Sequence, residues 1–268
     1  MRAYLVLLSF LIVIFMIGRA ASVAAVENKP ETILIVLTNV AKVPGTDRAT
    51  GFWAEEFVIP CEIFKKEGFN VVTASVNGGI PPVDPASLDP AMIDRQQAKH
   101  MSDYLANNRE LMTSIALKDI KNEDYNAVFI VGGHGVMWDL STSELMHALA
   151  VRTLAEGKVL SAVCHGPGAI ANARKPDGEF LVKGRKVTGF SNAEEKAGKM
   201  DSVVPYSLED ALRKNSGGLY AAGEMWKSHV VVDGNLVTGQ NPSSSAETAN
   251  AVVKAMKSMT EDPSLKQK

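Results

Sequence analysis

The sequence lacks the features that identify several common classes of protein. It holds only two cysteines in 268 residues, and two cysteines make no disulfide framework. Its 28 basic and 30 acidic residues give a net charge of −2, so no basic excess indicates nucleic acid binding and no acidic run indicates disorder. We find no internal repeat. The 46% hydrophobic and 22% charged residues are typical of a globular chain, long enough for one large domain or two small ones.

The five histidines show no paired spacing of the kind that metal sites use. We therefore predict neither a catalytic metal nor a cofactor.

The first 25 residues differ from the rest of the chain. A short positive start at Arg2 precedes a nearly unbroken apolar run from Leu5 to Ile17, and small residues follow at 22–25. This order is typical of a secretory signal peptide. The apolar core is shorter than the roughly 20 residues of a spanning helix, although an uncleaved membrane anchor is the alternative. We expect residues 1–25 to be removed, leaving 26–268 as a single α/β domain in an exported, periplasmic protein.

Beyond the leader, strand-like and helix-like segments alternate. Continuous apolar runs predict buried strands at 32–38, 70–76, 127–131 and 159–163, with later strands at 186–188, 230–232 and 235–238. Helical spacing favours helices at 52–67, 91–117, 141–156, 166–173 and 242–259, and Ser141-Thr-Ser-Glu144 has the pattern of a capping box. Asp233-Gly234 predicts a hairpin turn. The sequence therefore predicts an α/β fold with a mainly parallel, doubly wound sheet.

One cysteine, Cys164, follows the strand at 159–163 directly and precedes a histidine and a small-residue turn, in Ser161-Ala-Val-Cys-His-Gly-Pro-Gly168. Ligands of such folds bind beyond the carboxyl ends of the strands. A sharp turn from strand to helix exposes a nucleophile there, and a helix N-terminus is expected to lower the pKa of its thiol. We predict that Cys164 is a nucleophile and interpret Cys61, inside a helix-like run, as a small packed residue.

A second strand end carries flexible backbone at Gly132-Gly-His-Gly135. Its amides could bind an oxyanion that faces the thiol, with Gly133 in the oxyanion pocket and His134 at the entrance.

Four motifs together resemble the ThiJ/PfpI superfamily, whose members are class I glutamine amidotransferase-like, and are most similar to its heat-shock chaperone and glyoxalase III branch. The motifs are Val163-Cys-His-Gly-Pro-Gly168, Val131-Gly-Gly-His-Gly135, Thr50-Gly-Phe-Trp-Ala-Glu-Glu-Phe57 and Thr238-Gly-Gln-Asn-Pro-Ser-Ser244. The resemblance covers about residues 31–258.

The resemblance implies a flavodoxin-like three-layer sandwich with Cys164 at a nucleophile elbow. It implies that His165 is the catalytic histidine and that Glu56, rather than Glu55, lies against the sulfur. An acidic residue after the next strand orients the histidine in this branch, and of Glu194 and its neighbour Glu195 we prefer Glu194.

The resemblance also implies a glutathione-independent glyoxalase that converts a small dicarbonyl, methylglyoxal, to lactate, and a homodimer. Cys164 would form a hemithioacetal, and His165 or Glu56 would move a proton between the two carbons. Relatives also suggest a cysteine peptidase or amidase, a holding chaperone, or a redox sensor.

Overall fold

The computed structural model describes residues 30–121 and 125–261, so the predicted signal peptide lies outside the described residues. They contain a seven-stranded sheet in the order β3-β2-β1-β4-β5-β7-β6. Every neighbouring pair is parallel except β6 and β7. The strands are β1 Thr32–Leu37, β2 Asn70–Ser75, β3 Ile115–Ala116, β4 Ala127–Ile130, β5 Val159–Val163, β6 Val230–Asp233 and β7 Leu236–Gly239.

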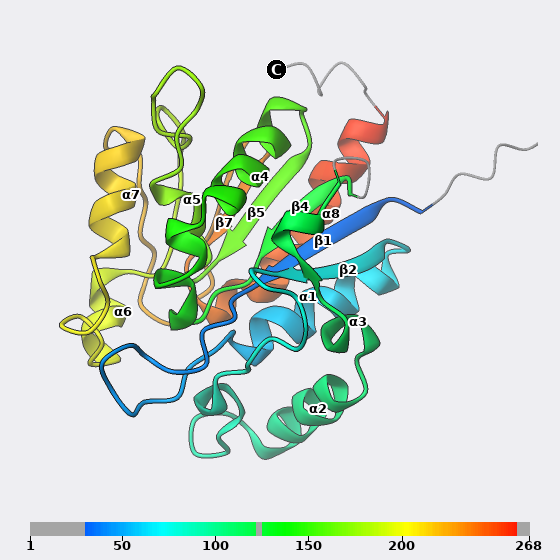
Figure 1. Cartoon of the computed structure of the whole chain (residues 1–268), viewed down its shortest axis with the longest axis vertical. Helices are drawn as coiled ribbons and strands as arrows, with labels where there is room; N and C mark the ends of the chain where they lie inside the picture. Colours follow the sequence, from blue (N-terminus) through cyan, green and yellow to red (C-terminus); the bar gives the residue numbers. More distant parts are fainter. Residues whose placement is uncertain (1–29, 122–124, 262–268) are drawn as a thin grey trace, which may run out of the picture.

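The helices lie on both faces of this sheet (Figure 1). Helices α1 and α8 pack against one another on one face, and α4, α5 and α7 cover the other. The α-helices are α1 Ala54–Lys66, α2 Arg95–Ala106, α3 Arg109–Met112, α4 Glu144–Ala155, α5 Gly168–Ala171, α6 Asn192–Ala197, α7 Leu208–Ser216 and α8 Ser245–Glu261. This arrangement confirms the predicted α/β three-layer fold.

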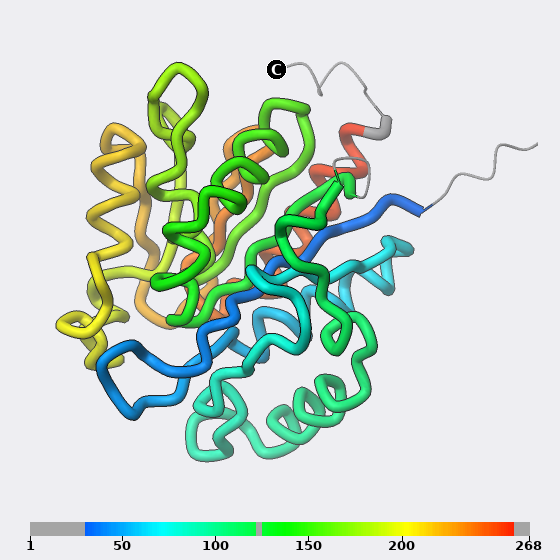
Figure 2. Tube along the Cα trace, in the orientation of Figure 1, coloured from blue at the N-terminus to red at the C-terminus, as the bar shows by residue number. Residues whose placement is uncertain are grey.

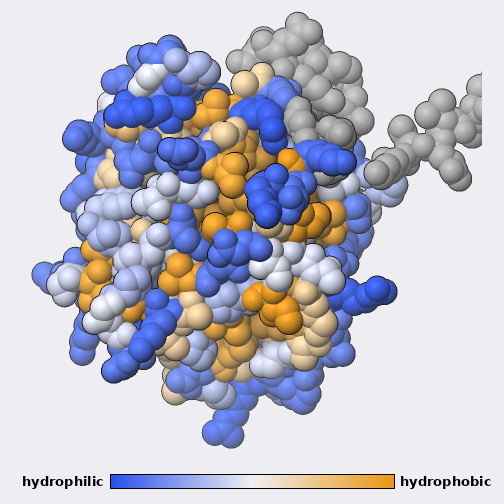
Figure 3. Space-filling view, viewed as in Figure 1, coloured by the Kyte–Doolittle hydropathy of each residue, from blue (hydrophilic) through white to orange (hydrophobic). Residues whose placement is uncertain are grey.

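The core follows from the apolar runs of the sequence. All residues of β1, β4, β5 and β7 are buried, as strands covered by helices on both faces must be. Figure 3 shows one face of the same molecule, where hydrophilic side chains dominate the rim and apolar ones gather toward the middle. No helix among the described residues is long and apolar enough to cross a membrane.

Several predicted boundaries were wrong. Helix α4 begins at Glu144, and its N-cap is Ser143, whose hydroxyl accepts from the Met146 N–H. Ser141 instead lies in the short 3₁₀ helix η5, Leu140–Thr142, so the predicted capping box does not form. The helix expected over 166–173 is only α5, and the strand expected at 186–188 is a single bridge from Val187 to Tyr220.

The carboxyl ends of β1, β4, β5 and β7 meet at one edge of the sheet, where loops distant in sequence come together. The loop after β1 (blue) and the segment that follows α6 (yellow) lie side by side in Figure 2. The Arg48 guanidinium of the first donates to the Met200 sulfur of the second. This edge holds all the predicted site residues.

Candidate active site

Cys164 occupies a strained turn directly after β5. Its φ is +60°, a left-handed conformation that side chains other than glycine seldom adopt. Two hydrogen bonds fix the turn: the Cys164 N–H donates to the Gly239 carbonyl of β7 at 2.9 Å, and the Phe190 N–H donates to the Cys164 carbonyl at 2.8 Å. This geometry confirms the predicted sharp turn, but the expected exposure of the nucleophile was wrong, because Cys164 is only 3% exposed.

His165 lies beside the thiol, with its Nδ1 3.4 Å from the Cys164 sulfur. Its Nε2 is 2.9 Å from Glu195 Oε2. An ionised carboxylate only accepts hydrogen bonds, so Nε2 carries the proton and Nδ1 is left as an acceptor facing the thiol. The imidazole is therefore oriented to take the thiol proton.

Glu195, not Glu194, is the carboxylate on His165, so our preference for Glu194 was wrong. Glu194 is buried in a capping box: its side chain accepts from the N–H and hydroxyl of Ser191, the N-cap of α6. Its other partners are Trp226, Gln240 and Asn241. The pattern Ser191-Asn-Ala-Glu194 is itself a capping-box signature, and it could have assigned Glu194 to the cap.

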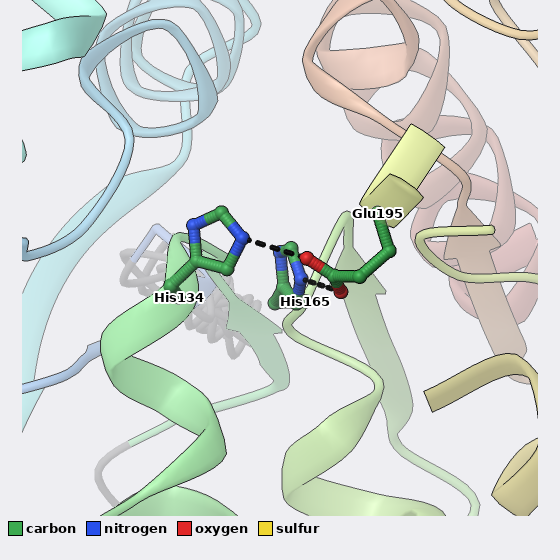
Figure 4. Close-up of side chains that lie close together, drawn as sticks. All are labelled: His134, His165 and Glu195. Atoms are coloured by element: carbon green, nitrogen blue, oxygen red, sulfur yellow. Dashed lines mark hydrogen bonds and ion pairs between the residues drawn. The ribbon is translucent and has the colours of Figure 1, made fainter. Parts of the chain in front are cut away.

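His134 shares the same carboxylate, a contact that the sequence did not predict. Its Nε2 lies 2.9 Å from Glu195 Oε1, and its ring centroid is 4.2 Å from that of His165 (Figure 4). Figure 4 shows one oxygen of Glu195 directed at each imidazole. Each carboxylate oxygen thus has a ring N–H partner, which fixes the carboxylate in the plane that His165 requires.

The cluster shifts the pKa values of its members. Burial alone raises the Glu195 pKa, but the charge of His165 and the hydrogen bonds from both imidazoles outweigh it, so this pKa lies far below its ordinary value. Burial, and then the electrostatic interaction with His165, lower the pKa of His134 to about 4. At neutral pH His134 is therefore neutral and Glu195 is ionised.

These same three side chains are a group that could hold a metal ion. The ligand atoms offered by His134, His165 and Glu195 lie within 4.8 Å of one another, and two imidazoles with a carboxylate suit several transition metals. Two of the residues follow strands β4 and β5 and the third lies in helix α6, so no spacing in the sequence could reveal them. Our prediction of no catalytic metal remains a prediction.

Glu56 approaches the thiol from the other side. It lies in the first turn of α1, is fully buried, and its Oε2 accepts from the Gly132 N–H at 2.8 Å. The Cys164 thiol lies beside this carboxyl and interacts with it. Burial raises the Glu56 pKa well above its ordinary value.

The expected low pKa of the thiol was wrong. Burial, and then the negative charge of Glu56, raise the Cys164 pKa, although the Gly133 N–H opposes the shift by donating to the sulfur. Helix α5 has only four residues and begins at Gly168, so no long helix directs its N-terminus at Cys164. The resting thiol therefore keeps its proton until His165 removes it.

Glycines make the close approach of β4, β5 and α1 possible. A Cβ at Gly132 would lie 2.7 Å from both Glu56 Oε2 and the backbone nitrogen of His165. Gly133 has a φ of +100°, and a Cβ there would overlap the Gly51 carbonyl oxygen. A larger residue at either position would displace the carboxyl or the elbow.

Cys61 is buried in α1 as predicted, and both cysteines are free thiols. Burial raises its pKa above its ordinary range, which suits a packed, unreactive residue.

A buried cysteine at a strained strand end, a histidine and a carboxylate define a nucleophile-elbow site on a parallel sheet. The model of the DJ-1/PfpI family matches residues 48–255. The chain belongs to this family.

The curated relatives point to one branch. A glutathione-independent glyoxalase of Schizosaccharomyces pombe is 34% identical over 218 residues, covering 77% of this chain and 89% of the relative. Glyoxalase 3 of Candida albicans is 32% identical, covering 83% of this chain and 97% of the relative.

Solved structures agree with this assignment. The Rapid Encystment Protein of 24 kDa from Francisella tularensis superposes with a TM-score of 0.78 at 31% identity, covering 84% of this chain and 99% of its own. The crystal structure of glyoxalase III from Candida albicans gives a TM-score of 0.75 at 28% identity, covering 84% of this chain and 97% of its own.

Proposed function

We propose that this protein is a glutathione-independent glyoxalase that converts methylglyoxal to lactate without metal or cofactor. The observation that carries the proposal is the arrangement of Cys164, His165 and Glu195 at the elbow, with Glu56 on the opposite side of the sulfur. Relatives named as glutathione-independent glyoxalases, similar over most of the chain, support the same reaction.

The reaction begins at the sulfur. As the Cys164 sulfur attacks the aldehyde carbon, His165 Nδ1 takes the thiol proton and returns it to the carbonyl oxygen, giving a neutral hemithioacetal. Glu195 stabilises the imidazolium that forms in between, because the two groups are 2.9 Å apart and almost fully buried. The backbone N–H of Gly133 lines the position where the oxygen would carry negative charge, and His134 lines the entrance.

The second stage moves hydrogen between the two substrate carbons. Glu56 is the group we assign to it, because its Oε1 is buried and has no hydrogen-bond partner among the described residues. It removes the proton from the first carbon to give an enediolate and then protonates the second carbon, while the hydroxyl proton on the first oxygen passes to the second oxygen. The product is a thioester of lactate on Cys164, and water releases lactate and regenerates the thiol. Methylglyoxal and one water thus become lactic acid.

Solvent labelling tests the proton transfer between the two carbons, and the Glu56→Gln variant tests which residue carries it out. In D₂O, deuterium at the second carbon of lactate is expected in wild type and in any active variant. Glu56→Gln should lose turnover while Cys164 is still alkylated, because His165 can still accept the thiol proton. Full turnover in Glu56→Gln would contradict the role given to Glu56 and leave His165 as the carbon base.

We also propose that the protein is exported and loses its leader. The support is the order of Arg2, the apolar run and the small residues at 22–25. The mass of protein recovered from the periplasm of an expressing bacterium should correspond to a start near Val26. A full-length chain in the membrane fraction would instead support the anchor.

We further propose a homodimer, on the family resemblance alone. Light scattering of the protein without its leader should then give twice the mass of one chain, and a single-chain mass would refute it.

A further inference from the structure

Aromatic rings lead from the buried histidine to the surface. The His165 and Phe190 ring centroids are 4.4 Å apart, and those of Phe190 and Trp226 are 5.7 Å apart. Exposure rises along the same series: His165 is 1% exposed, Phe190 6% and Trp226 44%. The Phe190 N–H also donates to the Cys164 carbonyl, so the residue in the middle of this series is hydrogen-bonded to the backbone of the nucleophile.

Trp226 is held in a conformation that it would not adopt alone. Its φ is +61°, and among the described residues other than glycine only Cys164 and Lys199 share this left-handed backbone conformation. Such conformations persist where the surroundings over-determine them, and they cluster at functional sites. A large apolar side chain held half-exposed in this way suggests a use for its free face.

Glu194 is the residue that holds it. Glu194 Oε1 accepts from the Trp226 N–H at 2.9 Å and from Asn241 Nδ2 at 2.8 Å, and Oε2 accepts from Gln240 Nε2 at 3.1 Å. Glu194 is fully buried, and its neighbour on α6 is Glu195, the partner of both histidines. One short helix therefore positions both the catalytic imidazole and the turn that carries Trp226.

We propose that Trp226 is a specificity-determining residue, the outer apolar wall of the approach to Cys164, and that it favours 2-oxoaldehydes with an aromatic substituent. The inference rests on the proposed glyoxalase function. A methyl substituent offers little surface to an indole ring, whereas a phenyl ring can form an aromatic pair with it. Removing Trp226 should thus affect phenylglyoxal and leave methylglyoxal almost unchanged.

The test compares kcat/KM for phenylglyoxal and methylglyoxal in wild type, Trp226→Ala and Trp226→Phe. The ratio of the two should fall about tenfold in Trp226→Ala and be largely retained in Trp226→Phe. Met225→Ala is the matched control, because Met225 is the adjacent residue with the same 44% exposure. Its ratio should stay within about twofold of wild type.

A second measurement does not depend on turnover. Alkylation of Cys164 by 2-iodo-N-phenylacetamide and by iodoacetamide, followed by mass spectrometry, reports whether an aromatic group is favoured on the way to the thiol. Trp226→Ala should lower the ratio of the two rates several-fold.

The two measurements separate the two proposals. If wild type converts neither dicarbonyl but the alkylation ratio falls in Trp226→Ala, the glyoxalase proposal fails and the role of Trp226 stands. An alkylation ratio that is unchanged in Trp226→Ala, or that falls equally in Met225→Ala, overturns the inference whatever the turnover.

Discussion

Replacing Glu195 by glutamine tests the arrangement at the centre of the site. The change keeps the size of the side chain and removes its negative charge. It also replaces one acceptor oxygen by an NH₂ group, which cannot accept the ring N–H that each histidine directs at the carboxylate. The amide group must then turn toward either His134 or His165, and the histidine it faces must change tautomer.

The expected loss follows from the geometry. The charges of a protonated His165 and Glu195 are centred about 4 Å apart, which at an effective dielectric constant of about 20 corresponds to about 4 kcal/mol. Glu195 is almost fully buried, so solvent screens this interaction little. The charge stabilises the imidazolium only after His165 has taken the thiol proton, so its removal raises the barrier. We expect kcat for lactate formation to fall about a thousandfold.

The assay is lactate formation from methylglyoxal, with far-UV circular dichroism as a check on folding. Glu194→Gln is the matched control, since Glu194 is the adjacent buried glutamate and contacts neither histidine. Its activity per folded molecule should stay within about threefold of wild type. Loss of equal size in both variants, or a Glu195→Gln enzyme with more than a tenth of wild-type activity, would refute this account of the cluster.

Three further predictions concern the same edge of the sheet. Glu56→Gln should lower kcat at least about a hundredfold, measured as lactate, whereas the Glu55→Gln control should stay within about twofold; equal losses would contradict the choice of Glu56. The pKa of His134 is about 4 in the folded protein and about 6.5 in the unfolded chain. Between these two values the unfolded chain binds a proton that the folded protein does not, so the free energy of unfolding falls as the pH falls from about 6.5 to about 4. The free energy of unfolding in urea should therefore fall by about 3 kcal/mol more over that interval in wild type than in His134→Gln. An equal fall in the two proteins would contradict the lowered pKa of His134. Gly132→Ala should cost about 2 kcal/mol or more in urea unfolding and abolish activity, because a Cβ would lie 2.6 Å from the Val163 carbonyl oxygen; a fully active variant would show that the elbow can relax.

The sequence predicted the sheet well where burial alone determines the pattern. The runs that form β1, β4 and β5 are almost entirely apolar because helices cover both faces. Strand β3 has only two residues, Ile115–Ala116, too few to show any period, and it was missed inside a predicted helix.

The nucleophile was predictable because its position has a local signal in the sequence, namely a strand end followed by small residues. The choice between Glu194 and Glu195 also had a local signal, because the capping-box pattern Ser191-Asn-Ala-Glu194 assigns Glu194 to the cap and adjacent residues of one helix point in different directions. The cap at Ser191 uses Glu194, and this leaves Glu195 to face the histidines. The raised pKa of Cys164 instead depends on burial and on Glu56, which no local pattern contains.

Lactate formation from methylglyoxal without glutathione, by the protein from about residue 26 onward beside Cys164→Ser, tests the central claim most directly. Lactate from the wild type and none from Cys164→Ser is the predicted result. No lactate from either, while Cys164 of the wild type is still alkylated rapidly, would contradict the glyoxalase function and show that this site serves another reaction.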